Sequence, residues 1–211
     1  MIRFYMKKIL PALLLPVFCI ILAQSVAHAA SSQPRQELET TINAVLAELK
    51  RPELKNPATR ENVLRRVEDI IRGLFSFQEL SMRTVGPEWK NLDQDQKNRF
   101  SAAFETLLRE TYLEKLDGYN GEQVNYTGEL DLGKNRVEIQ TTVNIKNKPV
   151  PVNYRMIQRG KWVVYDVVIE GVSMVANYRS QFQNVIARNG AEKLIELVRS
   201  KADEAMALNR K

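Results

Sequence analysis

The sequence predicts an α+β fold, in which a curved antiparallel sheet of four or slightly more strands is packed with helices on one face. Two changes of hydrophobic period support this prediction. Apolar residues recur with a helical period from residue 36 to residue 112, alternate with polar residues from residue 124 to residue 156, and return to the helical period after residue 173. Only short turns separate the strands, which favours an antiparallel meander. Helices, then strands, then helices are typical of an α+β domain.

Four helices are expected before the sheet, at residues 36–50, 57–73, 75–85 and 93–118. Pro52 ends the first helix. Asn56 followed by Pro57 favours a helix start, because the Asn side chain can accept a hydrogen bond from the first turn and proline suits the first helical position. Asp93 and Gln96, three residues apart, form a capping-box pattern that opens the fourth helix.

Four strands are expected at residues 124–132, 137–145, 150–156 and 162–169. The first three alternate apolar and polar residues, as in a sheet with one solvent-facing side. The fourth is apolar at nearly every position, which is typical of a strand covered on both faces. Two helices are expected after it. The first begins with Ser173 as N-cap and the second spans residues 192–206, with a break at Asn189-Gly190 between them.

Residues 1–29 are predicted to be a cleaved signal peptide. Arg3, Lys7 and Lys8 form a short basic region, residues 9–23 are almost wholly apolar, and Ala27-His28-Ala29 is a small-x-small cleavage site. An apolar run of this length, interrupted by prolines, is short for a bilayer span, so an uncleaved anchor is the less favoured interpretation. Residues 30–211 are then expected to form a single α+β domain, or one domain with two sublobes.

The composition of residues 30–211 excludes several function classes. Cys19 and His28 lie in the predicted signal, so neither a thiol nor an imidazole remains for nucleophilic catalysis or for the usual zinc sites. No Gly-rich phosphate loop and no calcium loop is present, so we expect no cofactor and no metal. Three of the 31 basic residues lie in the signal and none of the 25 acidic ones does, which leaves a net charge of +3. That charge is too small to indicate nucleic-acid binding.

One carboxylate interrupts the apolar strand at residues 162–169. By strict alternation Asp166 lies on the side of the strand that also carries Val164. Carboxylate–Tyr or carboxylate–Arg chemistry remains possible, because some cone-shaped α+β enzymes need nothing else, so an enzyme that uses Asp166 as acid or base in an apolar cavity is one hypothesis. The other interpretation is a carboxylate that is satisfied by a neighbouring Arg or Tyr, or that faces water.

Large apolar side chains are concentrated in three segments: the helix stripe of residues 100–112, the even positions of residues 152–156 and the helix of residues 174–186. A well-packed core accounts for most such residues in most proteins. A cavity between the sheet and the helices would use the same residue types. Periodicity does not separate a filled core from a cavity, so both interpretations stay open at this point.

Two stretches carry a resemblance to a known family. The first contains Phe75-Ser76-Phe77-Gln78-Glu79-Leu80-Ser81-Met82-Arg83, then Gly86 and Trp89, then Phe100, Phe104, Leu107, Leu108 and Tyr112. The second runs from Gly160-Lys161-Trp162-Val163-Val164-Tyr165-Asp166 through Val167-Val168-Ile169-Glu170-Gly171-Val172-Ser173 to Phe182. Together they closely resemble the periplasmic phospholipid-binding MlaC family, also called the toluene-tolerance family, over nearly all of residues 30–211. Ser76 departs from the pattern, since an Asp is common there.

The resemblance implies an NTF2-like core with additional helices and a carrier of the Gram-negative periplasm. It implies a bound phospholipid whose acyl chains lie in a deep apolar pocket, with the head group near the opening. It also implies exchange of lipid with an outer-membrane lipoprotein–porin complex and with an inner-membrane ABC transporter that has an MCE-domain subunit. Such exchange maintains the lipid asymmetry of the outer membrane.

A lining for the implied pocket follows from helix faces and strand positions that can point the same way. The expected lipid-binding residues are Leu107, Leu108, Tyr112, Val143, Val152, Tyr154, Val164, Val167, Ile169, Val172, Val175 and Tyr178. Arg179 is expected near the phosphate of the head group, with a solvated helix residue as the other interpretation. Besides the carrier and the enzyme, a structural adaptor of the periplasm remains a third hypothesis, one without a cavity or bound lipid.

Overall fold

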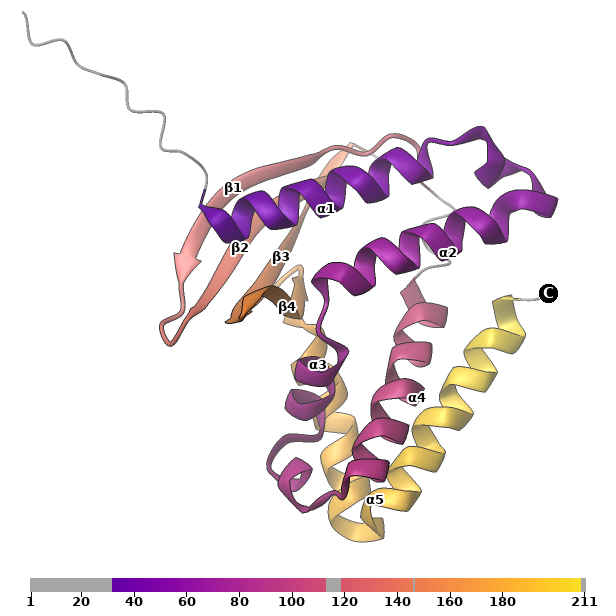
Figure 1. The fold of residues 1–211 in the computed structure, drawn as a ribbon, viewed down its shortest axis with the longest axis vertical. Helices are drawn as coiled ribbons and strands as arrows, with labels where there is room; N and C mark the ends of the chain where they lie inside the picture. The colour runs from indigo at the N-terminus through magenta and orange to yellow at the C-terminus, as the bar shows by residue number, and fades with distance from the viewer. Residues whose placement is uncertain (1–31, 113–118, 146, 210–211) are drawn as a thin grey trace, which may run out of the picture. The chain divides into compact units, whose positions relative to one another are not determined.

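The computed structural model describes residues 32–112, 119–145 and 147–209, so the predicted signal peptide and residues 113–118 of the fourth expected helix lie outside the described residues. The α-helices are α1 (Gln33–Leu49), α2 (Pro57–Leu74), α3 (Phe77–Val85), α4 (Gln94–Tyr112) and α5 (Met174–Asn209), with 3₁₀ turns η1 (Pro52–Lys55) and η2 (Gly86–Asn91). The strands are β1 (Val124–Asp131), β2 (Arg136–Ile145), β3 (Lys148–Arg159), β4 (Lys161–Ile169) and β5 (Val172–Ser173). Figure 1 shows these elements.

The strands pair in the order β1-β2-β3-β4-β5, each antiparallel to the next. The α+β prediction is therefore confirmed, with the two-residue β5 added to the four expected strands. Short turns make this order the natural one, since antiparallel neighbours need only a tight reversal of the chain. Among the described residues, none of the helices combines the length and the apolar character that crossing a membrane requires.

The expected helix starts are present in the structure. The amide of Ala58 donates to Asn56 Oδ1 at 3.0 Å at the start of α2. The capping box at α4 is complete, because Gln96 N donates to Asp93 Oδ1 at 2.7 Å and Asp93 N donates to Gln96 Oε1 at 3.1 Å. Ser76, which departs from the family pattern, still caps α3 by accepting from Glu79 N at 3.2 Å.

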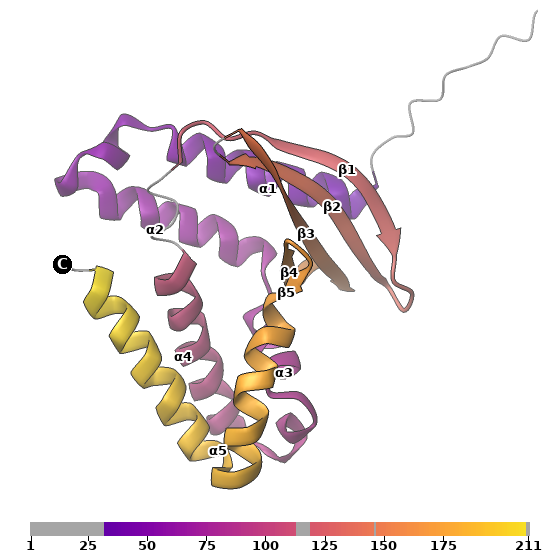
Figure 2. The same ribbon diagram turned by 180° about the vertical axis from the view of Figure 1, so that it is seen from behind.

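The break expected at Asn189-Gly190 divides α5 into two helical halves. Gly190 has φ 79° and ψ 177°, a backbone conformation outside the helical region that glycine adopts without a Cβ clash. The halves meet at the bottom of Figure 2 and both rise from there, one toward β5 and one toward the C-terminus. The chain therefore leaves the sheet in the first half of α5, reverses at Gly190, and runs back beside α4 in the second half.

A β-bulge in β4 changes which residues face which side of the sheet. Met156 pairs with Val164 and Arg155 pairs with Asp166, so Tyr165 is the extra residue. Val164 and Asp166 consequently lie on opposite faces. The alternation argument, which placed Asp166 on the side of Val164, was wrong because strict period-2 counting does not hold across a bulge.

Buried apolar residues gather in two main clusters. The helical cluster joins α3, α4 and α5, and at its centre the Phe104 ring lies 5.1 Å from Tyr178 and 6.0 Å from Phe182 in edge-to-face contacts. The sheet cluster contains Leu38, Leu74, Val137, Ile139, Met156 and Val164. Phe75, between α2 and α3, packs against both clusters. In Figure 2, α3, α4 and α5 lie below the sheet, whereas α1 runs behind β1 and β2 and contributes Leu38 to the sheet cluster.

Candidate functional site

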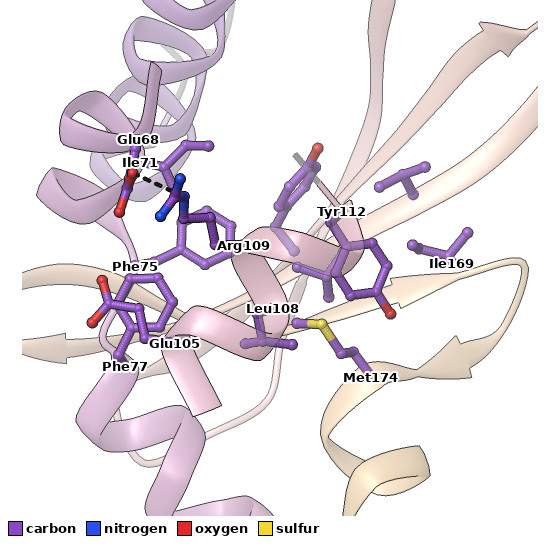
Figure 3. Close-up of a pocket in the computed structure, with 13 residues that line it drawn as sticks. Glu68, Ile71, Phe75, Phe77, Glu105, Leu108, Arg109, Tyr112, Ile169 and Met174 are labelled. Atoms are coloured by element: carbon purple, nitrogen blue, oxygen red, sulfur yellow. Dashed lines mark ion pairs between the residues drawn. The ribbon is translucent and has the colours of Figure 1, made fainter. Parts of the chain in front are cut away.

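A cavity of about 350 Å³ lies where the two clusters meet. Its lining comes from α2 (Glu68, Ile71), the α2–α3 link and α3 (Phe75, Phe77), α4 (Glu105, Leu108, Arg109, Tyr112), β3 (Val152, Tyr154), β4 (Val167, Ile169) and the first residue of α5 (Met174). Figure 3 shows these side chains around the space. The walls are almost wholly apolar, and the charged members Glu68, Glu105 and Arg109 all belong to α2 and α4.

The bulge in β4 fixes the sheet wall of this cavity. In the register beyond it, Tyr154 pairs with Val167 and Val152 pairs with Ile169. These four residues therefore share one face, and all four line the cavity. Without the extra residue, the neighbours of Val167 and Ile169 in the chain would take their places, and the buried carboxylate of Asp166 would be on the cavity side.

The link between α2 and α3 is attached to the same sheet. Phe75 forms a parallel bridge with Val164, and Ser76 N donates to Val164 O at 3.0 Å. This attachment holds Phe75 and Phe77 at the wall formed by α2 and α3. An aromatic pair at this link is part of the first stretch that resembles the family.

A second apolar cavity of about 340 Å³ adjoins the first. It lies between α1, α2 and the strands β1 to β3, and it shares Ile71, Phe75 and Tyr154 with the first cavity. Burial raises the pKa of Tyr154 to about 12, as expected for a phenol among apolar groups. The apolar space thus continues on both sides of Ile71, Phe75 and Tyr154, from α4 to α1.

The expected lining residues fall into three sets. Leu108, Tyr112, Val152, Tyr154, Val167 and Ile169 line the first cavity, and Val143 lines the second. Leu107, Val164, Val175 and Tyr178 are buried in the two clusters. Val172, the first residue of β5, pairs with Ile169 and is 62% exposed. Leu107 and Leu108 separate because successive helix positions point about 100° apart, so only one of them reaches a given wall.

Arg179 lies elsewhere. Its Nε donates to the carbonyl oxygen of Arg83 at 2.6 Å, near the C-terminal end of α3. It is not among the described residues that line the cavity. In this structure its side chain joins α5 to α3.

Five charged side chains, which we call the charged rim, bridge α2 and α4 beside the cavity: Glu61, Glu68, Arg72, Glu105 and Arg109. Arg72 Nη2 lies 2.7 Å from Glu68 Oε1 and 3.0 Å from Glu105 Oε1. Arg109 Nε lies 3.4 Å from Glu68 Oε2, and Arg109 Nη2 lies 3.6 Å from Glu61 Oε1. Burial raises the pKa of Glu105, an effect that Arg72 opposes and Glu68 reinforces.

Sequence reasoning missed the charged rim and also Ile71, Phe75, Phe77 and Met174. Phe75 and Phe77 could have been predicted as lining residues, since large aromatic side chains are unusual at a short link between two helices. The rim carried none, because its members are ordinary polar positions of two amphipathic helices until the fold brings α2 and α4 together.

Asp166 has a complete set of partners away from the cavity. It is 3% exposed and accepts from Ser173 Oγ at 2.6 Å, Val175 N at 3.0 Å and Arg155 Nη1 at 3.1 Å. It thereby caps the start of α5 and joins that helix to β3 and β4. The described lining residues do not include Asp166, and within residues 32–112, 119–145 and 147–209 no cluster of acidic side chains could hold a metal ion.

Comparison with known proteins agrees with the geometry. The family model described as MlaC protein matches residues 39–200. The intermembrane phospholipid transport system binding protein MlaC of Haemophilus influenzae is 24% identical over 133 residues, which are 60% of this chain and 62% of that relative. The chain thus spans less than two thirds of that relative's length.

A solved structure shows the same fold. It is a phospholipid-binding protein from Ralstonia solanacearum in complex with a phospholipid, with a TM-score of 0.73 and 24% identity, covering 83% of this chain and 99% of that chain. The five-stranded sheet, the helices around it and the family model over well over half of the sequence lead to one assignment. The chain belongs to the MlaC family.

Proposed function

We propose that this chain is a phospholipid carrier whose cavity holds acyl chains. The observation that carries the proposal is the unfilled apolar space between the helical cluster and the sheet cluster. A well-packed core leaves few voids larger than a water molecule, so two adjoining apolar cavities of this size need an occupant or a use. A solved protein of the same fold is described as in complex with a phospholipid, which supports the choice of occupant.

The thermodynamics of lipid transfer explains why such a carrier is needed. Exposing about 28 methylenes of a diacyl lipid to water costs on the order of 20 kcal/mol, at about 0.8 kcal/mol for each CH₂. Free passage across an aqueous gap is therefore negligible. A cavity as apolar as a bilayer makes the transfer nearly neutral, so exchange runs in either direction and a partner that uses ATP can set the direction. No catalytic residue is required.

The place of the carrier follows from the same proposal. We infer that the chain works in the periplasm after export, and that it moves phospholipid between an outer-membrane lipoprotein–porin complex and an inner-membrane ABC transporter with an MCE-domain subunit. The name of the Haemophilus influenzae relative, an intermembrane phospholipid transport system binding protein, supports this inference. Loss of the carrier is then expected to raise the phospholipid content of the outer leaflet, measured by chemical labelling of intact cells.

Extraction of the purified protein with organic solvent tests the proposal. Mass spectrometry of the extract is expected to show stoichiometric phospholipid. The delipidated protein is expected to take phospholipid from vesicles and to release it to lipid-free acceptor vesicles. Protein that yields no lipid and takes none from any vesicle would rule out the carrier and would favour the adaptor.

A further inference from the structure

The charged rim borders the cavity and is partly open to water. Glu68, Glu105 and Arg109 belong both to the rim and to the cavity lining, so the apolar wall and the ionic groups are continuous (Figure 3). The rim is also within reach of water, since the side chains of Arg109, Arg72 and Glu61 are 34%, 52% and 60% exposed. An amphiphile requires this arrangement, in which its apolar chains lie in the cavity and its polar group lies at the edge.

Arg109 is held more loosely than the other rim arginine. Its contacts with carboxylates of described residues are 3.4 Å to Glu68, 3.5 Å to Glu110 and 3.6 Å to Glu61, whereas Arg72 lies 2.7 Å from Glu68. The Arg109 Nε atom is buried without a hydrogen bond. A guanidinium that spends few donors on its neighbours can bind a phosphate through two parallel N–H groups.

Carboxylates outnumber guanidinium groups around Arg109. Counting only described residues, the rim has three carboxylates and two arginines, and Glu110 adds a fourth carboxylate beside Arg109. An anionic head group would meet this surplus of negative charge. A zwitterionic head group offers a phosphate to Arg109 and an ammonium to the carboxylates of Glu61 and Glu68, so both of its charges are matched.

We propose that the charged rim is a binding site for a zwitterionic phospholipid head group, with the phosphate on Arg109 and the ammonium on Glu61 and Glu68, and that it disfavours anionic head groups. The inference rests on the proposed function and adds a head-group preference to it. Glu68 holds Arg109 in the empty carrier and gains the ammonium as a second partner when lipid binds. Because a zwitterionic lipid carries no net charge, its binding leaves the net charge of the site unchanged.

Competition between two lipids measures this preference. Delipidated protein is incubated with vesicles of equimolar phosphatidylethanolamine and phosphatidylglycerol with identical acyl chains, re-isolated, and its bound lipids are quantified by mass spectrometry. The unaltered protein is expected to bind phosphatidylethanolamine in excess by about threefold or more, as one or two partly exposed ion pairs allow. Glu61→Gln is expected to remove most of that excess, and Glu68→Gln to remove it or reverse it.

Two further variants separate recognition from general damage. Glu192→Gln breaks an ion pair with Arg99 of 2.7 Å on residues that do not line the cavity, and it is expected to keep the excess unchanged. Arg109→Gln is expected to lower uptake of both phospholipids but not of diacylglycerol with the same chains, which has no phosphate. Equal binding of the two phospholipids by the unaltered protein, or an unchanged ratio in both glutamate variants, would overturn the head-group proposal. If the unaltered protein took up neither the phospholipids nor diacylglycerol, the proposed carrier function itself would be overturned.

Discussion

A carboxylate placed on the sheet wall of the cavity should separate lipid binding from folding. Val152 lines the cavity opposite α4 and is only partly buried by the protein itself, unlike Val164, which is fully buried in the sheet cluster. In the empty Val152→Glu variant, the new carboxylate faces the unfilled space, where water can solvate it. We therefore expect the variant to fold, with a melting temperature close to that of the unaltered protein.

Acyl chains in the cavity would remove that water. Burial of a polar group without a hydrogen bond costs at least about 2 kcal/mol, which corresponds to a loss of roughly 30-fold in lipid affinity. The assay is the amount of phospholipid that co-purifies with the protein, together with transfer of a fluorescent phospholipid between vesicles. Leu130→Glu, at an exposed apolar position of β1 that does not line the cavity, serves as the control and should retain lipid. Normal lipid content in a folded Val152→Glu protein would refute the placement of the acyl chains.

Three other substitutions test the fold and its electrostatics. Asp166→Asn should lower the free energy of unfolding by about 2–3 kcal/mol, because it weakens charge-assisted bonds to Arg155 and the α5 cap, yet the protein should keep its lipid; urea unfolding and lipid extraction check both points. If the unaltered protein catalysed a reaction and Asp166→Asn abolished it, the enzyme hypothesis would be supported instead. Asp93→Ala should cost about 1 kcal/mol through loss of the capping box, again by urea unfolding, and no change would show that the cap is unimportant. Glu105→Gln tests the pH dependence of stability. Burial raises the pKa of Glu105 in the folded protein, so the folded protein binds more protons than the unfolded chain. The ionised Glu105 therefore destabilises the fold, and this cost grows as the pH rises above the ordinary pKa of 4.5. The lipid-free variant should therefore be more stable than the unaltered protein at pH 7 and should lose that advantage at low pH, and an equal difference at both values would contradict this.

The elements of the fold could be predicted because their signals are local. The capping box at Asp93, the Asn56-Pro57 start of α2 and the break at Gly190 are each decided by a few neighbouring residues, and the structure contains all three. The turns between strands are local in the same way, and they fix the antiparallel order. The periodic patterns of apolar residues, together with these local signals, therefore sufficed to predict the fold class.

The cavity could be predicted only in part, because its walls depend on structural irregularities and tertiary packing that the hydrophobic period of the sequence does not reveal. The bulge at Tyr165 shifts the phase of β4, so Asp166 turns away from Val164 and the residues beyond it exchange faces. Tyr178 and Tyr112 are the same residue type on apolar helix faces, yet Tyr178 makes an edge-to-face contact with Phe104 inside the helical cluster while Tyr112 lines the cavity.

The charged rim shows the same limit for polar residues. Glu68 and Arg109 are far apart in the sequence, and each lies on the polar side of its own helix. Only the packing of the fold brings the two helices close enough for the ion pair of 3.4 Å. Arg179 was expected near the head group, and in the structure its Nε donates to the carbonyl oxygen of Arg83 in α3, a contact that its own helix does not reveal.

The position of a bound acyl chain is the most direct test of the carrier. A phospholipid with a bromine atom in its acyl chain can be loaded from vesicles, and anomalous X-ray scattering from crystals of the loaded protein then locates the bromine. We expect the bromine peak among Ile71, Leu108 and Val152, inside the first cavity. A peak on the outer surface, or a loaded protein whose cavity is closed by its own side chains, would contradict the account.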